Sequence, residues 1–242
     1  MKAKWMKWGL LAVMSTSILT ACQNQPKNEA DTVSGASIKT PREIIKSPVK
    51  KTDFLLGTAV ALSVYHPNTE EVITNALEMI KDLEKRITVN ASGSEVDEVN
   101  LAAGEKPVKV SADVYELIKL GLKYSEEFDG AFDITVGPLT ALWHIGFDDA
   151  KKPTQEEIDA VLPLVNYKDV ELNDAEQTVF LKKKGMQLDL GGIAKGYIAD
   201  KVWEYFAKEG ITTAVIDLGG NIVVMGGSPA RDGVAWSVGI QD

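Results

Sequence analysis

The sequence contains a single cysteine, has no apolar run long enough to cross a membrane, and carries no excess of positive charge in its folded part. With one cysteine, Cys22, no disulfide can form within the chain. The apolar run from Trp8 to about Leu19 is shorter than the roughly 20 residues that a membrane-spanning helix needs. A disulfide framework and a permanent membrane span are therefore not expected.

Charge is unevenly divided along the chain. Residues 51–242 hold 18 Lys and Arg against 32 Asp and Glu, a formal charge of −14. A surface this acidic repels nucleic acid and anionic lipid head groups, so no nucleic acid partner is expected. If this part of the chain handles phosphate groups, we expect a metal ion to mediate.

The first 22 residues have the order of a secretory signal: a basic stretch over residues 2–7, then the apolar run, then small residues. Leu-Thr-Ala-Cys at 19–22 resembles the lipobox of bacterial lipoproteins, in which the cysteine thiol receives a diacylglyceryl group and becomes the new first residue. We expect residues 1–21 to be a signal peptide and Cys22 to anchor the protein on the outer face of the bacterial cytoplasmic membrane, because two acyl chains anchor stably. An ordinary signal peptide with a chance cysteine is the alternative.

The rest of the chain divides into two parts by composition. Residues 22–50 are polar, contain three prolines and show no periodic apolar pattern, which is typical of a flexible tether. Residues 51–242 are long enough for one sizeable domain with its own core. No internal repeat is evident.

The domain shows a mixed pattern of helices and strands, which predicts an α+β fold rather than a regular βαβ repeat. Helices are expected after the capping residues Asn68, Ser111 and Thr154, and from Ile193 to Glu209 before the terminator Gly210. The first helix is expected to bury Val72, Ile73, Ala76, Leu77, Ile80, Leu83 and Ile87. Strands are expected at 54–65 with an interruption at Gly57, and at 170–172, 178–181, 186–190, 213–218, 222–225 and 234–240. Nothing closes the last strand, so we expect the chain to be a fragment.

Three glycine-rich segments are candidate sites: residues 130–138, 189–197 and 217–221. Each segment taken alone is also explained by turn formation. In that interpretation, Asp133 of the first segment has the structural role of accepting hydrogen bonds from backbone amides. The second segment connects an expected strand to an expected helix. Its backbone amide groups and the helix dipole therefore favour binding of an anion, and Lys195 adds a positive charge. This lysine lacks the glycine spacing and the following Ser or Thr of a Walker loop.

In combination and in this order, the segments resemble the ApbE-type FAD:protein FMN transferases, from about Leu55 to the last residue. Leu-Gly-Thr at 56–58 corresponds to the family's Met-Gly-Thr, residues 94–100 to its Ser-Glu-x-x-x-x-Asn stretch, and residues 130–139 to its Gly-Ala-Phe-Asp-x-Thr-Val-Gly-Pro-Leu motif. Residues 189–197 and the Gly-Gly-Asn turn match as well. The resemblance implies an α+β flavin transferase domain with mixed and antiparallel sheets and flanking helices, incomplete at the C-terminal end.

The resemblance also implies a reaction. FAD is split at its pyrophosphate, AMP leaves, and FMN is joined to a Thr or Ser hydroxyl of an extracytoplasmic acceptor protein of an electron-transfer chain. Mg²⁺ assists, because it bridges phosphate oxygens and offsets the charge that develops on the leaving group. The family's FAD contacts carry over to Leu56, Asn90, Ala131, Phe132, Asp133, Asp189 and Lys195, and its backbone metal ligand carries over to Gly192.

Two positions depart from the family's pattern. Leu56 replaces the usual methionine, which is a tolerable apolar exchange. Asn90 stands where many members have an aromatic residue, so we expect weaker retention of FAD. The family's His-bearing segment and its further metal ligands have no counterpart here, since His66 and His144 match neither, and His144 is expected to be a packing residue. Residues 1–242 alone are therefore expected to be inactive or nearly so.

One segment of the tether resembles the sequence to which the family attaches FMN. Asp-Thr-Val-Ser-Gly-Ala-Ser at 31–37 is similar to the acceptor motif Asp-x-x-Ser/Thr-Gly-Ala-Thr/Ser, whose last hydroxyl receives the flavin. The resemblance implies covalent FMN on Ser37. A linker of small residues explains the same segment equally well.

Three functions are therefore compatible with the sequence. The leading hypothesis is a membrane-tethered FAD:protein FMN transferase. The second is a non-catalytic flavin-binding or covalently flavinylated electron-transfer lipoprotein, which the missing metal ligands and Ser37 favour. The third is a solute-binding lipoprotein.

Overall fold

The computed structural model describes residues 42–240. The predictions for the signal peptide at 1–21, for Cys22 and for Ser37 lie outside these residues. At Arg42 the chain is already part of the fold, because its N–H donates to the carbonyl of Gly210 at 3.2 Å. The folded part therefore starts before the boundary predicted at residue 51.

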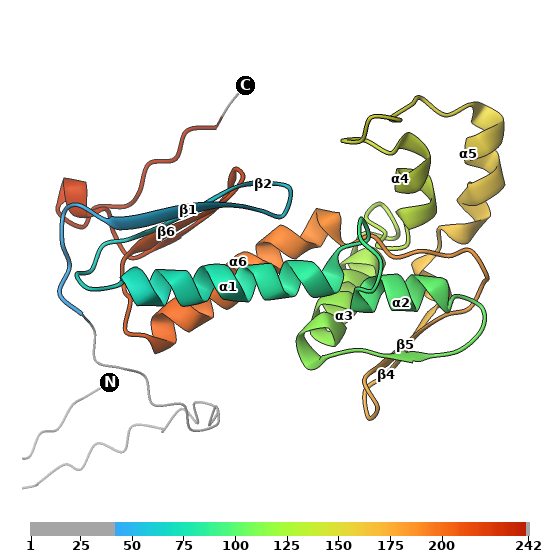
Figure 1. Ribbon diagram of the computed structural model, residues 1–242, viewed down its shortest axis with the longest axis horizontal. Coiled ribbons are helices and arrows are strands. Elements are labelled where there is room, and N and C mark those ends of the chain that lie inside the picture. Colours follow the sequence, from blue (N-terminus) through green and yellow to red (C-terminus); the bar gives the residue numbers. More distant parts are fainter. Residues whose placement is uncertain (1–41, 241–242) are drawn as a thin grey trace, which may run out of the picture. The chain divides into compact units, whose positions relative to one another are not determined.

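The larger sheet has the antiparallel order β1-β2-β6-β7 (Figure 1). Its strands are β1 (Val49–Leu55), β2 (Thr58–Val64), β6 (Ala214–Leu218) and β7 (Asn221–Met225). A turn at Leu56 and Gly57, with φ of 56° and 67°, joins β1 to β2. The single interrupted strand predicted over 54–65 is therefore wrong, because the chain reverses there and forms a hairpin. A type I′ hairpin turn needs positive φ at both central residues, and a leucine does not signal this.

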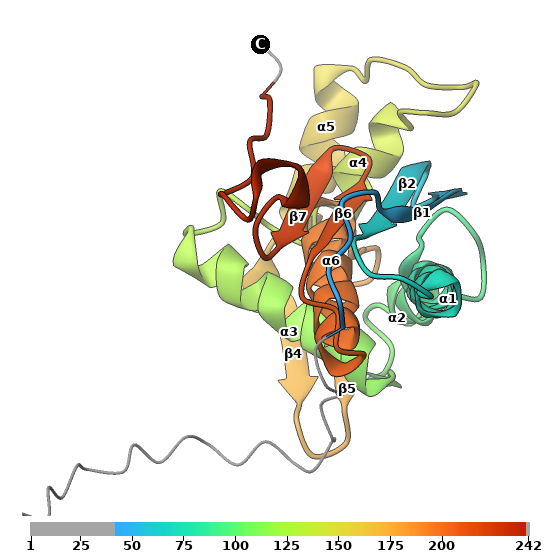
Figure 2. The ribbon, with the colours of Figure 1, turned by 90° about the vertical axis from the view of Figure 1, so that its left-hand side faces the viewer.

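Two long helices, α1 (Glu70–Ile87) and α6 (Gly191–Lys208), lie side by side against one face of this sheet (Figures 1 and 2). All seven apolar residues predicted for the buried face of the first helix are buried. Its N-cap is Thr69 rather than Asn68, whose φ of 57° keeps it outside the helix. Gly210, with φ of 76°, follows the end of α6 as predicted.

The remaining elements lie at the end where α1 stops and α6 begins (Figure 1). They are α2 (Glu95–Leu101), α3 (Ala112–Glu127), α4 (Gly137–Trp143), α5 (Gln155–Val161), β3 (Val108–Lys109), β4 (Val170–Asn173) and β5 (Thr178–Leu181). The three strands form a second antiparallel sheet of order β3-β5-β4. The predicted hairpin of β4 and β5 and the capping box at Thr154 and Glu157 are confirmed, as is the α+β class.

Two predicted strands are absent from the described part of the chain. Residues 186–190 and 234–240 form no strand, and each segment has only one isolated bridge, at Gln187 and at Val234 respectively. Alternating apolar residues predict an extended segment, but a strand also needs a partner along its length. Conversely, α2 and α4 were not predicted, since both are short and carry few apolar residues at helical spacing.

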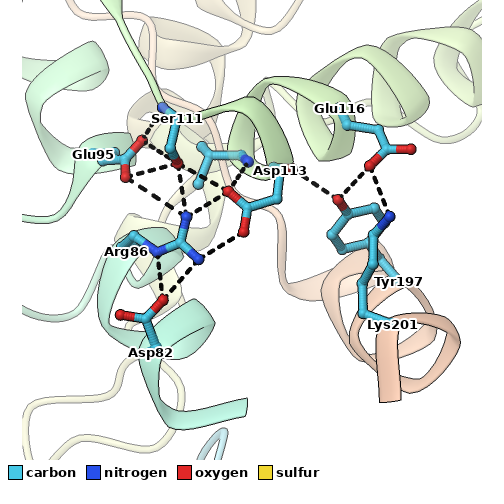
Figure 3. Close-up of polar contacts among 9 residues, drawn as sticks. Asp82, Arg86, Glu95, Ser111, Asp113, Glu116, Tyr197 and Lys201 are labelled. Carbon is cyan, nitrogen blue, oxygen red and sulfur yellow. Dashed lines mark hydrogen bonds and ion pairs between the residues drawn. The ribbon is translucent and has the colours of Figure 1, made fainter. Parts of the chain in front are cut away.

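An ionic network joins the start of α3 to the end of α1 (Figure 3). The Arg86 guanidinium donates from Nη2 to Asp113 Oδ2 at 2.7 Å, from Nη1 to Ser111 Oγ at 2.7 Å and from Nε to Asp82 Oδ2 at 2.9 Å. Glu95, at the start of α2, accepts from the Ser111 backbone at 2.6 Å. The hydrogen bond from Arg86, supported by one from Ser111, lowers the pKa of Asp113 to about 2 against the opposing effect of burial.

This network predicts a loss of stability in acid. A carboxyl group whose pKa is lower in the folded than in the unfolded chain stabilises the fold above its unfolded pKa of about 3.9. The free energy of unfolding should therefore fall as the pH drops from about 5 toward the folded pKa of about 2. Urea unfolding at a series of pH values measures this. Asp113→Asn should flatten the dependence, and an unchanged profile would count against the network.

Candidate functional site

Two of the predicted glycine-rich segments lie against each other. The N–H of Gly137 donates to the carbonyl of Gln187 at 3.2 Å, and the N–H of Asp189 donates to the carbonyl of Ile134 at 2.8 Å. A Cβ atom on Gly137 would lie 2.6 Å from the Gln187 oxygen, so only glycine permits this approach. The loop 130–138 and the start of α6 are thus fixed relative to each other.

Asn100 holds the same segment from the other side. Its side-chain Nδ2 donates to the carbonyl of Leu188 at 3.1 Å, and its Oδ1 accepts from the N–H of Leu188 at 2.7 Å. Ser94 starts the helix that presents Asn100, because its hydroxyl accepts from the N–H of Asp97 at 2.9 Å. The Ser-Glu-x-x-x-x-Asn stretch therefore supports the site by positioning the backbone next to Asp189.

A wide cleft of about 670 Å³ opens beside this junction. More of its lining residues are apolar or aromatic than polar, and the polar groups come from Asn90, Asp97, Asn100, Thr140, Gln187 and Asp189. The apolar and aromatic contributors from α4 and the residues that follow it are Leu139, Trp143, His144, Ile145 and Phe147. Such a cavity, apolar with a few polar groups, is typical of a site for a flat organic ligand.

A narrow pocket of about 180 Å³ adjoins the cleft, since Val89, Asn90 and Asp189 line both. Its other walls are the turn at Leu56 and Gly57, the end of α1 and the first turn of α6, including Lys195. Four of the predicted FAD contacts, from three separate parts of the sequence, therefore line this pocket: Leu56, Asn90, Asp189 and Lys195.

The narrow pocket is lined by one basic side chain, Lys195, and by two acidic ones, Glu84 and Asp189, whose carboxylates accept hydrogen bonds from the backbone. No acidic residue lies in the first turn of α6, and the N–H of Gly191 donates to Asp189 Oδ1 at 2.9 Å. Thr140 of α4 donates to the other oxygen of Asp189 at 2.8 Å. Within residues 42–240, Lys195 makes no ion pair. A helix N-terminus together with an unengaged ammonium group favours an anionic ligand.

The model of the ApbE family matches residues 56–242, which include every element that lines the cleft and the pocket. The chain belongs to the ApbE family. Two similar relatives are both named FAD:protein FMN transferase. The one from Klebsiella pneumoniae is 38% identical over 77% of this chain and 56% of its own length, and the one from Treponema pallidum is 33% identical over 79% and 57%.

Solved structures support the same assignment. The ApbE protein of Thermotoga maritima superposes with a TM-score of 0.70 at 30% identity, covering 76% of this chain and 60% of its own. The flavin transferase ApbE of Vibrio cholerae superposes with a TM-score of 0.72 at 25% identity, covering 80% and 63%. The chain thus spans little more than half the length of the curated ApbE relatives it matches.

The other predicted contacts of the ApbE motif lie apart from both cavities. Ala131, Phe132 and Asp133 line neither the wide cleft nor the narrow pocket. Both carboxylate oxygens of Asp133 are used within the chain: Oδ1 accepts from the N–H of Thr135 at 2.8 Å and Oδ2 from the N–H of Tyr167 at 3.0 Å. Asp133 thus joins the loop 130–138 to the backbone at Tyr167.

Gly192, the predicted backbone metal ligand, lies in the first turn of α6 against Phe132, whose Cε2 would be 3.2 Å from a Cβ at this position. Carbonyl groups in an α-helix point along the axis toward the residue four positions on. Among residues 42–240, no group of three or more His, Cys, Asp or Glu side chains is placed to hold a metal ion. The Gly192 carbonyl therefore stands without such a cluster of side chains among these residues.

The two histidines have separate structural roles. His66 is buried, and its Nε2 accepts from the N–H of Thr213 at 3.1 Å. His144 stacks on Phe147 with ring centroids 4.0 Å apart, and its Nδ1 lies 2.6 Å from Asp149 Oδ1. It is a packing residue, as predicted, but it packs at the wall of the cleft.

The helix α4, which contributes to this wall, was not predicted. Pro138, next to Gly137 at the start of α4, was the one signal in the sequence that could have revealed it.

Proposed function

We propose that the protein carrying this chain is an FAD:protein FMN transferase. It breaks the pyrophosphate bond of FAD, joins the FMN phosphorus to a Thr or Ser hydroxyl oxygen of an acceptor protein, and releases AMP while the hydroxyl proton is lost. One observation supports this most strongly: Asn90 and Asp189 line both the wide cleft and the narrow pocket, and Lys195 lines the narrow pocket with them. The names of the ApbE relatives support the same reaction.

Each cavity suits a different part of FAD. The wide cleft has an aromatic wall of Trp143, His144 and Phe147, which suits the flat isoalloxazine ring because aromatic rings stack. The narrow pocket offers the ammonium group of Lys195 and the N-terminus of α6, which suit the diphosphate. Asp189, held by Thr140 and Gly191, presents a fixed carboxylate where the two parts meet.

Mg²⁺ dependence is part of the proposal. When bound, the ion would offset charge on the phosphate oxygens. The backbone carbonyl of Gly192 is the group that the family resemblance implies would hold it. The chain's own contribution is to hold and orient the nucleotide.

The reaction is tested in the source cells by in-gel flavin fluorescence of denatured proteins. Disrupting the gene should abolish the bands of covalently flavinylated acceptors, and a plasmid copy should restore them. Acceptors that keep their fluorescence in the disrupted strain, with no second family member present, would refute the proposal.

We also propose that the protein acts on the outer face of the cell membrane, anchored through lipid on Cys22, where its acceptors would be electron-transfer proteins. Within residues 42–240, no helix is both long and apolar enough to cross a bilayer. The support for the anchor is the lipobox-like sequence at 19–22.

The second candidate function, a flavin carrier, is favoured by the acceptor-like segment at 31–37. It predicts an FMN adduct on Ser37. The mature N-terminal peptide is purified from flavin-replete cells. Mass spectrometry of this peptide detects both the FMN adduct and the lipid on Cys22. Ser37→Ala should remove the flavin and leave the lipid. An unmodified Ser37 would exclude the carrier function in this form.

A further inference from the structure

The turn between β1 and β2 adopts a conformation that its first residue disfavours. Leu56 has φ of 56°, in the left-handed region, where the Cβ of any residue except glycine crowds the backbone. The same turn forms one wall of the narrow pocket. The surrounding structure must therefore hold the turn in place for the pocket to keep its shape.

A side chain of α1, Glu84, keeps the turn in this conformation. Its Oε1 accepts a hydrogen bond from the N–H of Leu56 at 2.7 Å. This backbone N–H is partly buried and needs an acceptor, because leaving a buried donor unpaired is costly. Glu84 is half-buried and itself lines the narrow pocket.

The position of Glu84 links two walls of the pocket. Its backbone carbonyl accepts from the N–H of Thr88 at 3.0 Å, the bond that ends α1. Val89 and Asn90, which follow, line the pocket opposite the turn. One residue therefore fixes the end of α1 through its main chain and the hairpin turn through its side chain, with Lys195 on the third wall.

We propose that Glu84 is a positioning residue for nucleotide binding: it fixes Leu56 at the narrow pocket so that the phosphate-bearing part of FAD can reach Lys195. This rests on the proposed function. The hydrogen bond requires only an acceptor oxygen, which glutamine also supplies. The negative charge of Glu84 is not required.

The chain of 242 residues allows a direct test. Dissociation constants are measured for FAD, and for riboflavin, which lacks phosphate, with wild type, Glu84→Ala, Glu84→Gln and the control Glu78→Ala, an exposed glutamate on the same helix. We expect Glu84→Ala to bind FAD about tenfold more weakly, because small misplacements at a binding site are costly. Glu84→Gln and Glu78→Ala should match wild type, and all four proteins should bind riboflavin equally.

Three results would overturn the inference. Unchanged FAD affinity in Glu84→Ala would show that the turn does not need the hydrogen bond to Glu84. Equal losses in Glu84→Ala and Glu84→Gln would show that charge is what matters, and parallel losses for FAD and riboflavin would indicate general damage. Wild-type protein that binds no FAD would instead refute the proposed function, and this inference with it.

Discussion

Replacing Lys195 with alanine is expected to weaken FAD binding by about ten- to a hundredfold. The ammonium group lies in the narrow pocket near the N-terminus of α6 and has no ion-pair partner within residues 42–240. A hydrogen bond to a charged group contributes about 1.5–3 kcal/mol, and each 1.4 kcal/mol corresponds to about tenfold in affinity. Quenching of flavin fluorescence on titration measures the change.

The effect of Lys195 can be separated from general effects of charge. Lys208→Ala removes a lysine from the last turn of the same helix and should leave FAD affinity unchanged. Lys195→Arg keeps the charge and should recover part of the binding. Because Lys195 is not part of the hydrophobic core, the thermal unfolding temperature should stay close to that of wild type. Equal FAD affinity in Lys195→Ala and wild type would rule out this lysine as a phosphate contact.

Replacing Gly137 with alanine is expected to lower both stability and FAD affinity. The new Cβ would lie 2.6 Å from the carbonyl oxygen and 2.7 Å from the Cβ of Gln187, which is closer than van der Waals contact allows. Overpacking of this kind costs about 1–3 kcal/mol, or roughly 2–12 °C in unfolding temperature for a domain of this size. Because the backbone next to Asp189 must shift, the pocket should also lose its shape.

Gly196 provides the matched control. It lies in α6, and a Cβ there would meet no atom within 4 Å. Gly196→Ala should therefore keep or raise stability, by up to about 1 kcal/mol, because alanine favours the helix. Scanning calorimetry of both variants gives the comparison. If Gly137→Ala were as stable as Gly196→Ala, the close approach of the two glycine-rich segments would not be needed.

The sequence predicted the parts of the fold that depend on local periodicity. The buried face of α1 follows from apolar residues at helical spacing, and all seven predicted positions are buried. The capping box of α5 is likewise a local signal at Thr154 and Glu157. The hairpin turn at Leu56 was missed because the tertiary structure, including Glu84, imposes a conformation that leucine itself disfavours.

The sequence predicted which residues to consider at the site but not how they are arranged in space. The motifs identified Asn90, Asp189 and Lys195, which do meet at the two cavities. They could not show that one carboxylate oxygen of Asp133 accepts from Thr135 and the other from Tyr167, because Tyr167 is remote in sequence. The wall formed by α4 was missed for a similar reason: its residues line a cavity only when the whole domain is assembled.

A crystal structure of the chain with FAD would test the central claim most directly. The account predicts that the isoalloxazine ring lies in the wide cleft beside Trp143 and Phe147, and that a diphosphate oxygen lies within hydrogen-bonding distance of the Lys195 ammonium group. FAD bound elsewhere on the domain, or bound in the cleft with its diphosphate away from Lys195, would contradict the account.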